Sequence, residues 1–157
     1  MRSIYKIVVC SLLTLSITSC EKDLLEKEQY QKEIYLIGAY NRVWTTEVSY
    51  SNEEVKTYFT VSSSGTLALD RDVNVKMKIN EELVDIYNKK YWTVLNEDKY
   101  YKSLDTDLYS IPSLENTVIK HAEGISTEVP VLIKTASLKI DQSYVIPVEI
   151  ESTTGYP

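Results

Sequence analysis

The chain has few of the residues that carry nucleophilic or metal-dependent chemistry. Its only cysteines, Cys10 and Cys20, lie within the first twenty of 157 residues, so a disulfide framework or a cysteine-based zinc site is excluded from the rest. We expect the single histidine, His121, to be a surface residue at a strand end. With 4 glycines and no G-x-S-x-G sequence, a nucleophile elbow and a glycine-rich phosphate loop are also missing. We therefore predict a protein that is not an enzyme and has neither cofactor nor metal.

Positive charge is also scarce, which argues against nucleic acid as a partner. The formal net charge is -6 and the pI is near 4.9. No cluster of lysine and arginine could follow a phosphate backbone. The length of 157 residues suits one domain with its own core plus short appendages.

The first twenty residues have the layout of a secretory signal. Basic residues precede an apolar run at residues 7–15, which is too short to span a bilayer as a permanent helix. The sequence LSITSC that follows resembles the lipobox of bacterial lipoproteins, with an aliphatic residue, two small residues and a cysteine: Ile17, Thr18, Ser19 and Cys20. The resemblance implies that residues 1–19 are removed and that Cys20 becomes an acylated N-terminus, which anchors the protein in a membrane. The alternative is a plain signal peptide with an incidental cysteine.

Residues 20–33 form a charged segment in which EKDLLEKEQYQKE follows Cys20 without proline or glycine. Charges directly after a lipidated cysteine resemble the export signals of lipoproteins from Bacteroides-type bacteria. A solvated tether is the other interpretation, and the two are compatible. We therefore expect a lipid-anchored protein of the outer membrane that faces the cell exterior.

From residue 34 onward, apolar and polar residues alternate with the period of β-strands. The clearest case is VNVKMKI at residues 73–79, where every second residue is apolar. Similar patterns predict strands at residues 34–40, 44–50, 55–61, 116–122, 128–134 and 143–152. About seven strands with short polar connections predict an all-β fold, an immunoglobulin-like β-sandwich over residues 34–157.

One segment, INEELVDIYNKKYW, breaks the alternation and predicts a single short helix. Asn80 is placed to cap this helix, with acidic residues in its first turn and lysines in its last, which suits the helix dipole. The apolar stripe of this helix consists of Leu83, Ile86, Tyr87 and Tyr91.

Several stretches together carry a family resemblance: VKTYFTVSSSG, VNVKMKINEELVDIYNKKY, the Y-x-x-L at residues 101–104, and LKIDQSYVIPVEIES. The chain is similar to the N-terminal module of Bacteroides-type surface lipoproteins, known as domain of unknown function 1735. The most specific parts are LVDIYN and YVIPVEI. The chain ends at TTGYP soon after them, which fits either a stand-alone module or the first part of a longer protein.

The resemblance implies an immunoglobulin-like β-domain near the membrane in proteins of polysaccharide-utilisation systems. The function it implies is a non-catalytic, lipid-anchored cell-surface module that serves as a spacer or a weak glycan-binding or protein-binding domain. Its expected partners are the membrane, through acylated Cys20, and glycans or outer-membrane glycan-uptake proteins. The alternative is a structural or adhesin-like or pilin-like assembly subunit exported by the same route.

Two tryptophans are the candidates for glycan contact, because an exposed indole face can stack on a pyranose ring. Trp44 lies beside a predicted strand, and Trp92 lies just past the predicted helix. The competing interpretation is that Trp92 packs the end of the helix against the sandwich.

Two acidic patterns resemble functional sites but do not predict them. Glu81 and Glu82 are adjacent, so they do not face one sugar bond as paired glycosidase carboxylates must. DRDVNVKMKINE matches four ligand positions of an EF-hand calcium loop with Asp70, Asp72, Asn74 and Glu81. Val75 stands where that loop needs glycine, and the strand alternation continues through it, so we expect no calcium site.

Overall fold

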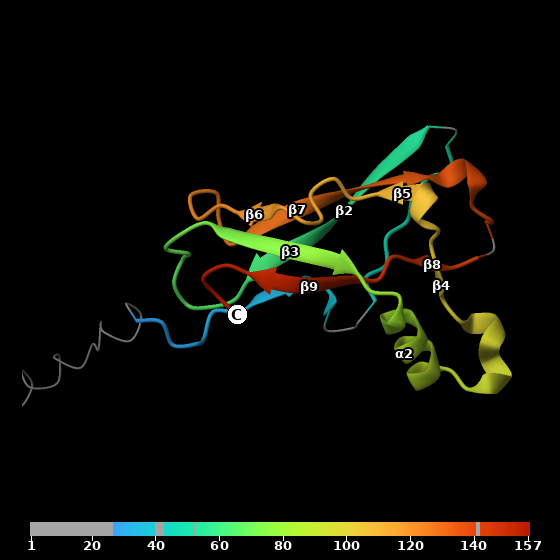
Figure 1. The fold of residues 1–157 in the computed structure, drawn as a ribbon, viewed down its shortest axis with the longest axis horizontal. Helices are drawn as coiled ribbons and strands as arrows, with labels where there is room; N and C mark the ends of the chain where they lie inside the picture. Colours follow the sequence, from blue (N-terminus) through green and yellow to red (C-terminus); the bar gives the residue numbers. More distant parts are fainter. Residues whose placement is uncertain (1–26, 40–42, 52, 141) are drawn as a thin grey trace, which may run out of the picture.

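The computed structural model describes residues 27–39, 43–51, 53–140 and 142–157, and Figure 1 shows its ribbon. Within these ranges the elements follow the order β1 (Ile34–Leu36), β2 (Glu54–Ser63), β3 (Val73–Ile79), α2 (Glu82–Tyr91), the 3-10 helix η3 (Val94–Lys99), β4 (Lys102–Ser103), the 3-10 helix η4 (Thr106–Leu108), β5 (Tyr109–Ser110), β6 (Thr117–Ile119), β7 (Ser126–Lys134), the 3-10 helix η5 (Thr135–Ser137), β8 (Tyr144–Val145) and β9 (Val148–Thr153). The prediction of an all-β sandwich with one short helix is confirmed, with nine described strands instead of seven.

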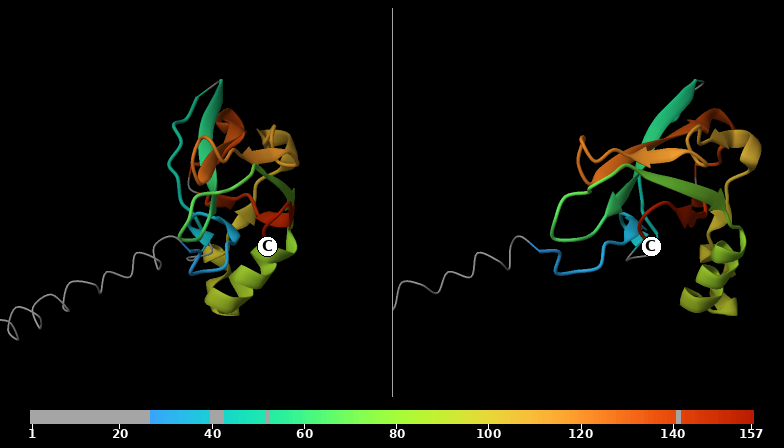
Figure 2. Two further views of the ribbon diagram at one scale, coloured as in Figure 1. Left: turned by 90° about the vertical axis from the view of Figure 1, so that its left-hand side faces the viewer. Right: turned by 60° about the vertical axis from the view of Figure 1, so that its left-hand side comes forward.

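The strands form two antiparallel sheets and a small parallel pair. One sheet has the order β1-β2-β7-β5, the second has the order β6-β3-β9, and β4 pairs with β8. The longest pairing joins β2 to β7, from Glu54 opposite Lys134 to Ser62 opposite Ser126. Figures 1 and 2 show the β3–β9 layer packed over the β2–β7 layer, with α2 at one side of the two layers.

The main core lies between the two sheets and explains the period-two pattern. In β3, Val73, Val75 and Met77 are buried while the alternate residues are exposed, as the sequence predicted. The other buried members come from several strands and one loop: Ile34, Val61, Leu69, Ile119 and Val129. Each such side chain contributes about 1.5–3 kcal/mol relative to an exposed one, so this cluster holds the two sheets together.

A second, smaller core lies at the end of β7 and joins the small parallel pair to the first sheet. Leu104, Val131 and Ile133 are buried there. Tyr144 and Ile146 pack against this cluster, whereas Val148 and Ile150 pack against the main core. The stretch 143–152, predicted as one strand, is therefore two strands that serve different cores.

Pro147 lies between β8 and β9 and marks the break. Proline has no N–H to donate to a ladder, and the carbonyl of Pro147 instead accepts a hydrogen bond from the Asn80 backbone N–H at 2.9 Å. The strands β4 and β5 have two residues each, too few for an alternation to be visible in the sequence, so they were not predicted.

The prediction of a strand at residues 44–50 was wrong, since the described residues 43–51 contain no strand. This segment is attached by side chains instead of a backbone ladder. The Thr46 and Thr57 hydroxyl oxygens lie 3.3 Å apart, and the Thr135 hydroxyl accepts a hydrogen bond from the Ser51 N–H at 2.9 Å. A segment with alternating apolar residues need not pair with a neighbouring strand when side chains form hydrogen bonds with its backbone groups.

The described start of the chain contacts the loop that follows β2. Lys32 pairs with the Glu28 carboxylate at 2.6 Å, and Glu28 accepts a hydrogen bond from the Leu67 N–H at 3.2 Å. Glu33 and Ser64 exchange hydrogen bonds at 2.9 Å. Glu28, Lys32 and Glu33 belong to the segment 20–33 that the sequence assigns to a tether. The boundaries 1–19, 20–33 and 34–157 stay predictions, and Cys20 lies outside the described residues.

The two ends of the sandwich lie next to each other. The Ile34 N–H donates a hydrogen bond to the carbonyl of Pro157 at 2.8 Å. In Figure 1 the described start of the chain and the C-terminus lie on the left side of the view, while α2 lies at the lower right. Within the described ranges, no helix has both the length and the apolar character needed to cross a bilayer.

Candidate functional site

The helix α2 and the 3-10 helix η3 form an extension of the sandwich, here called the α2 arm (residues 82–100). The helix begins at Glu82, and its N-cap residue is Glu81, whose side chain makes no capping hydrogen bond. The prediction of Asn80 as the cap was therefore wrong by one residue, although the Asn80 side-chain oxygen accepts a hydrogen bond from the Glu82 N–H at 3.2 Å. Acidic residues occupy the first turn and lysines the last, which suits the helix dipole. Figure 2 shows the arm projecting from the sheet layers.

The apolar stripe of α2 is not its buried face. The buried residues are Val84 and Asn88, whereas Leu83, Ile86 and Tyr91 are 37%, 55% and 49% exposed. The physical reason is that the helix does not lie along a sheet and is attached on a narrow face. Tyr87, the remaining member of the stripe, is half-buried and stacks its ring against Tyr91 at 4.5 Å.

Asn88 fastens α2 to the chain that follows the arm. Its side-chain amide donates to the Tyr101 carbonyl at 2.9 Å, and its side-chain oxygen accepts from the Tyr101 N–H at 3.0 Å. Asn88 is only 4% exposed, so both bonds are shielded from water. The Tyr87 and Tyr101 rings meet edge to face at 5.6 Å beside them. The Asn88 side chain and the Tyr87–Tyr101 ring pair thus hold the chain in place where it leaves the arm.

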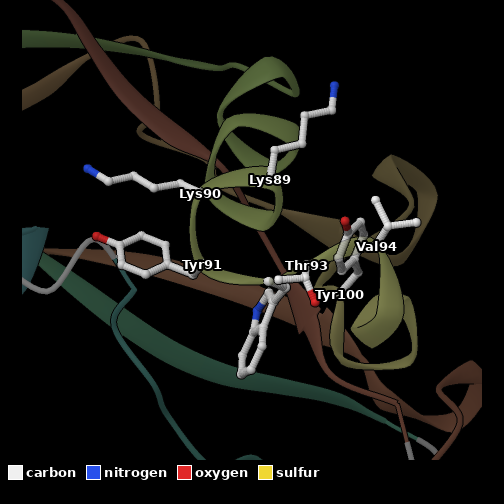
Figure 3. Close-up of a pocket in the computed structure, with 7 residues that line it drawn as sticks. Lys89, Lys90, Tyr91, Thr93, Val94 and Tyr100 are labelled. Carbon is white, nitrogen blue, oxygen red and sulfur yellow. The ribbon is translucent and has the colours of Figure 1, made fainter.

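An open hollow of about 360 Å³ lies at the C-terminal end of α2. Its lining residues come from the helix end, from η3 and from the residue after η3: Lys89, Lys90, Tyr91, Trp92, Thr93, Val94 and Tyr100. Figure 3 shows Tyr91 and Lys90 on one side and Val94 and Tyr100 on the other, with Thr93 between them. The hollow is open to solvent and does not enclose a ligand as a small-molecule cavity does.

Trp92 is half-buried in the wall of the hollow. Its indole Nε1–H is buried and has no hydrogen-bond partner in the described part of the chain. The Lys99 ammonium lies 5.6 Å from the centre of the indole ring, and the Lys90 ammonium lies 5.6 Å from the centre of the Tyr91 ring. The hollow therefore combines aromatic side chains with the lysines Lys89 and Lys90, and Lys99 lies over the Trp92 ring. Glycan contact by Trp92 stays a prediction.

Trp44, the other candidate, does not line this hollow. Its side chain is 60% exposed and packs against Gly38, which has a φ of +86°. A Cβ at position 38 would lie 2.6 Å from the Trp44 ring, so glycine allows the indole to lie flat on the backbone. The structure thus does not bring the two tryptophans into one site.

The residues of the calcium-loop pattern contact separate partners and do not converge. Asp72 Oδ1 lies 2.7 Å from Nδ1 of the exposed His121, and this hydrogen bond lowers the pKa of Asp72. Asp70 pairs with Arg71 at 2.9 Å, and Glu81 accepts a hydrogen bond from the Ser103 hydroxyl. The described ranges contain no group of three or more histidine, cysteine or acidic side chains that could hold a metal ion.

Sequence reasoning missed Tyr100 at the hollow, Lys99 over the Trp92 ring, and Asn88 as the residue that attaches the arm. The stretch NEDKYYK offered a signal for the first two, because it places aromatic and basic residues side by side. Nothing in the sequence marks Asn88, because its role depends on a contact with Tyr101 across the arm.

The fold and this site define a β-sandwich module with a helical arm, and comparisons with known proteins place it in a family. A family model described as a "-like, N-terminal domain" matches residues 30–157, and the chain belongs to that family. None of the curated proteins compared with it matches. No catalytic family is indicated by these comparisons.

Two crystal structures from Bacteroides ovatus resemble the chain. One is a protein of unknown function with a TM-score of 0.63 and 14% identity, matched over 82% of this chain and 42% of its own. The other is a multidomain protein including DUF1735, with a TM-score of 0.55 and 16% identity, matched over 65% of this chain and 33% of its own. The chain thus spans less than half of these structures. The resemblance to domain of unknown function 1735 is confirmed.

Proposed function

We propose that the chain is a non-catalytic, lipid-anchored cell-surface module of a glycan-acquisition system, and that its α2 arm binds glycan weakly. The observation that carries the proposal is the open hollow of about 360 Å³, lined by three aromatic residues and by lysines. Aromatic faces stack on the apolar faces of sugar rings, and an open hollow suits weak binding. None of the lining residues is a carboxylate, so the hollow lacks the paired acids of a glycosidase.

The position of the chain ends favours binding over a simple spacer role. Because Ile34 is hydrogen-bonded to Pro157, a chain that enters and leaves this sandwich does so at one place. Such a module adds little distance between an anchor and anything attached to its end. The α2 arm lies on the other side of the molecule from both ends (Figure 1), where it is free to meet a ligand.

The anchor is tested by replacing Cys20. We expect Cys20→Ala to release the protein from the membrane fraction, because the acyl chains need the thiol of that residue. Cys10→Ala is the matched control and should leave the protein in the membrane. If Cys20→Ala remained in the membrane fraction as fully as the wild type, acylation of Cys20 would not be the anchor.

Glycan binding is tested by affinity electrophoresis against a panel of host and plant polysaccharides. We expect at least one polysaccharide to retard the protein, and Trp92→Ala to abolish the retardation. Tyr58→Ala is a matched control, since Tyr58 is an exposed aromatic on β2 with Lys56 over its ring at 5.1 Å. If the whole panel caused no retardation, the binding role would be abandoned and the spacer role retained.

A second candidate, an assembly subunit that adds strands at a sheet edge, is favoured by one feature of β2. On the side facing β1, this strand is paired only near its end, from Thr60 to Ser63. Within the described ranges, residues 54–59 have no backbone partner on that side, and such an edge can accept a further strand. Ladders of polymers on unboiled denaturing gels would support assembly, whereas a single monomer band would exclude it.

A further inference from the structure

The hollow of the α2 arm is lined by two lysines, Lys89 and Lys90, and a third, Lys99, lies over the Trp92 ring. Four other described lysines, Lys32, Lys76, Lys78 and Lys120, form ion pairs with glutamates. Lys90 and Lys99 form no ion pair within the described residues, and each ammonium lies 5.6 Å from an aromatic ring centre. Positive charge thus gathers at one end of the arm in a chain of net charge -6.

The placement of these ammonium groups over rings matters for ligand binding. A cation over an aromatic face is held in position and is partly shielded from water. An anion that reaches it therefore loses less of the interaction to competing solvent than it would at a freely moving lysine.

The end of α2 supplies acceptors beside these donors. The last intrahelical bond runs from the Trp92 N–H to the Asn88 carbonyl at 2.9 Å. The final carbonyls of a helix have no partner within the helix and are available to other donors. A ligand that offers both an anionic group and hydroxyl groups matches this set of donors and acceptors better than a simple anion does.

Resting on the proposed function, we propose that the hollow recognises an acidic sugar, meaning a ring that carries a carboxylate or a sulfate. Its anionic group pairs with Lys90 and Lys99, and its hydroxyls donate to the carbonyls at the end of α2. Its ring lies against the aromatic residues of the hollow. Phosphate alone lacks the hydroxyl and ring contacts and binds much more weakly.

The test is affinity electrophoresis of the purified full-length chain in gels that contain polygalacturonate, chondroitin sulfate or a neutral galactan. We expect at least one of the acidic polymers to retard the protein and the neutral polymer to leave it unaffected. The double variant Lys90→Gln/Lys99→Gln should weaken binding about tenfold or more, because each charge-assisted hydrogen bond contributes about 1.5–3 kcal/mol. Raising the salt concentration should reduce the retardation of the wild type.

The matched control is Lys56→Gln, which removes an equivalent lysine over Tyr58 on β2 and should retain wild-type binding. Circular dichroism of both variants checks that these exposed substitutions leave the fold intact. Equal retardation by the neutral and acidic polymers, unchanged in the double variant, would overturn the acidic specificity and leave glycan binding standing. The absence of retardation in every gel would overturn both.

Discussion

Apolar side chains are buried in the sandwich but largely exposed in the α2 arm. In the sandwich, Val61, Val73 and Val75 are completely buried. In the arm, Val94 is 76% exposed and Leu95 is 93% exposed. The sandwich uses its apolar residues to close a core, whereas the arm presents them to solvent around a hollow. The sandwich core therefore stabilises the fold, whereas the hollow that we propose as a binding surface lies in the α2 arm.

The largest effect on stability is expected in the sandwich core. Met77 is 1% exposed, and Met77→Ala should lower the free energy of unfolding by about 2–5 kcal/mol, because it removes buried contacts and leaves a cavity. Leu95→Ala in the arm is the matched comparison and should change it by no more than about 0.5 kcal/mol. Chemical denaturation measures both, and similar losses in the two variants would break the contrast.

The next effect concerns the attachment of the arm. Asn88→Ala should destabilise the protein by about 1–3 kcal/mol, since it leaves the N–H and carbonyl of Tyr101 buried without partners. Hydrogen exchange should show the loss concentrated in the arm, with the β2–β7 ladder still protected. Asn116→Ala, at an exposed position, is the control. Uniform loss of protection across both regions would mean that the arm and the sandwich unfold as one unit.

A smaller effect is expected where Trp44 lies on Gly38. Gly38→Ala should cost about 1–2 kcal/mol in backbone strain, and the new methyl group should push the Trp44 ring away from the backbone. Gly124→Ala is the control, since Gly124 also has a positive φ, of +129°, but open space around it. Both variants are made in the Trp92→Phe protein, so that the emission comes from Trp44. The wavelength of maximum emission should shift in Gly38→Ala and stay unchanged in Gly124→Ala. An unshifted spectrum would contradict the packing of Trp44 on Gly38.

The smallest expected effect is the pH response of the N-terminal contact. The hydrogen bond from Lys32, together with the Thr66 and Leu67 N–H groups, lowers the pKa of Glu28 from 4.5 to about 2. A lowered folded-state pKa stabilises the contact fully above the unfolded value of 4.5 and loses that contribution as the pH falls toward 2.

The amide chemical shifts of Thr66 and Leu67 should follow this titration and should lose it in Glu28→Gln. Signals from the buried strand β3 should stay constant until the whole protein unfolds. A titration midpoint near 4.5 in the wild type would show that the Glu28 carboxylate does not make these contacts in solution.

The strands of the sandwich could be predicted from the sequence, because burial of one face of a strand makes apolar and polar residues alternate. Val73, Val75 and Met77 had to be apolar, and the residues between them had to tolerate water, so strand and face were both evident. The stretch 44–50 misled because Val48 is apolar through its contact with the second core, without any ladder. Strands of two residues, such as β4 and β5, carry no periodic signal at all.

The sequence predicted the helix of the arm, but it did not predict which of the helix side chains are exposed or that a hollow forms there. Helical spacing identified Leu83, Ile86 and Tyr91 as one stripe, but it did not show that these side chains are exposed. The hollow forms only in the folded chain, since Tyr100 reaches it after the chain turns back through η3. Trp92 was identified as a candidate for sugar contact from its aromatic character alone, and its lysine neighbour was not.

The most direct test of the difference between the two regions follows the two indole Nε1–H signals by NMR. Isotope-labelled full-length chain is titrated with an oligogalacturonate. The proposal predicts that the Trp92 indole signal and the backbone amides of Lys90 and Lys99 shift together, while the Trp44 indole signal and the amides of β2 stay in place. Shifts at Trp44 or along β2, with Trp92 unchanged, would contradict the assignment of binding to the α2 arm.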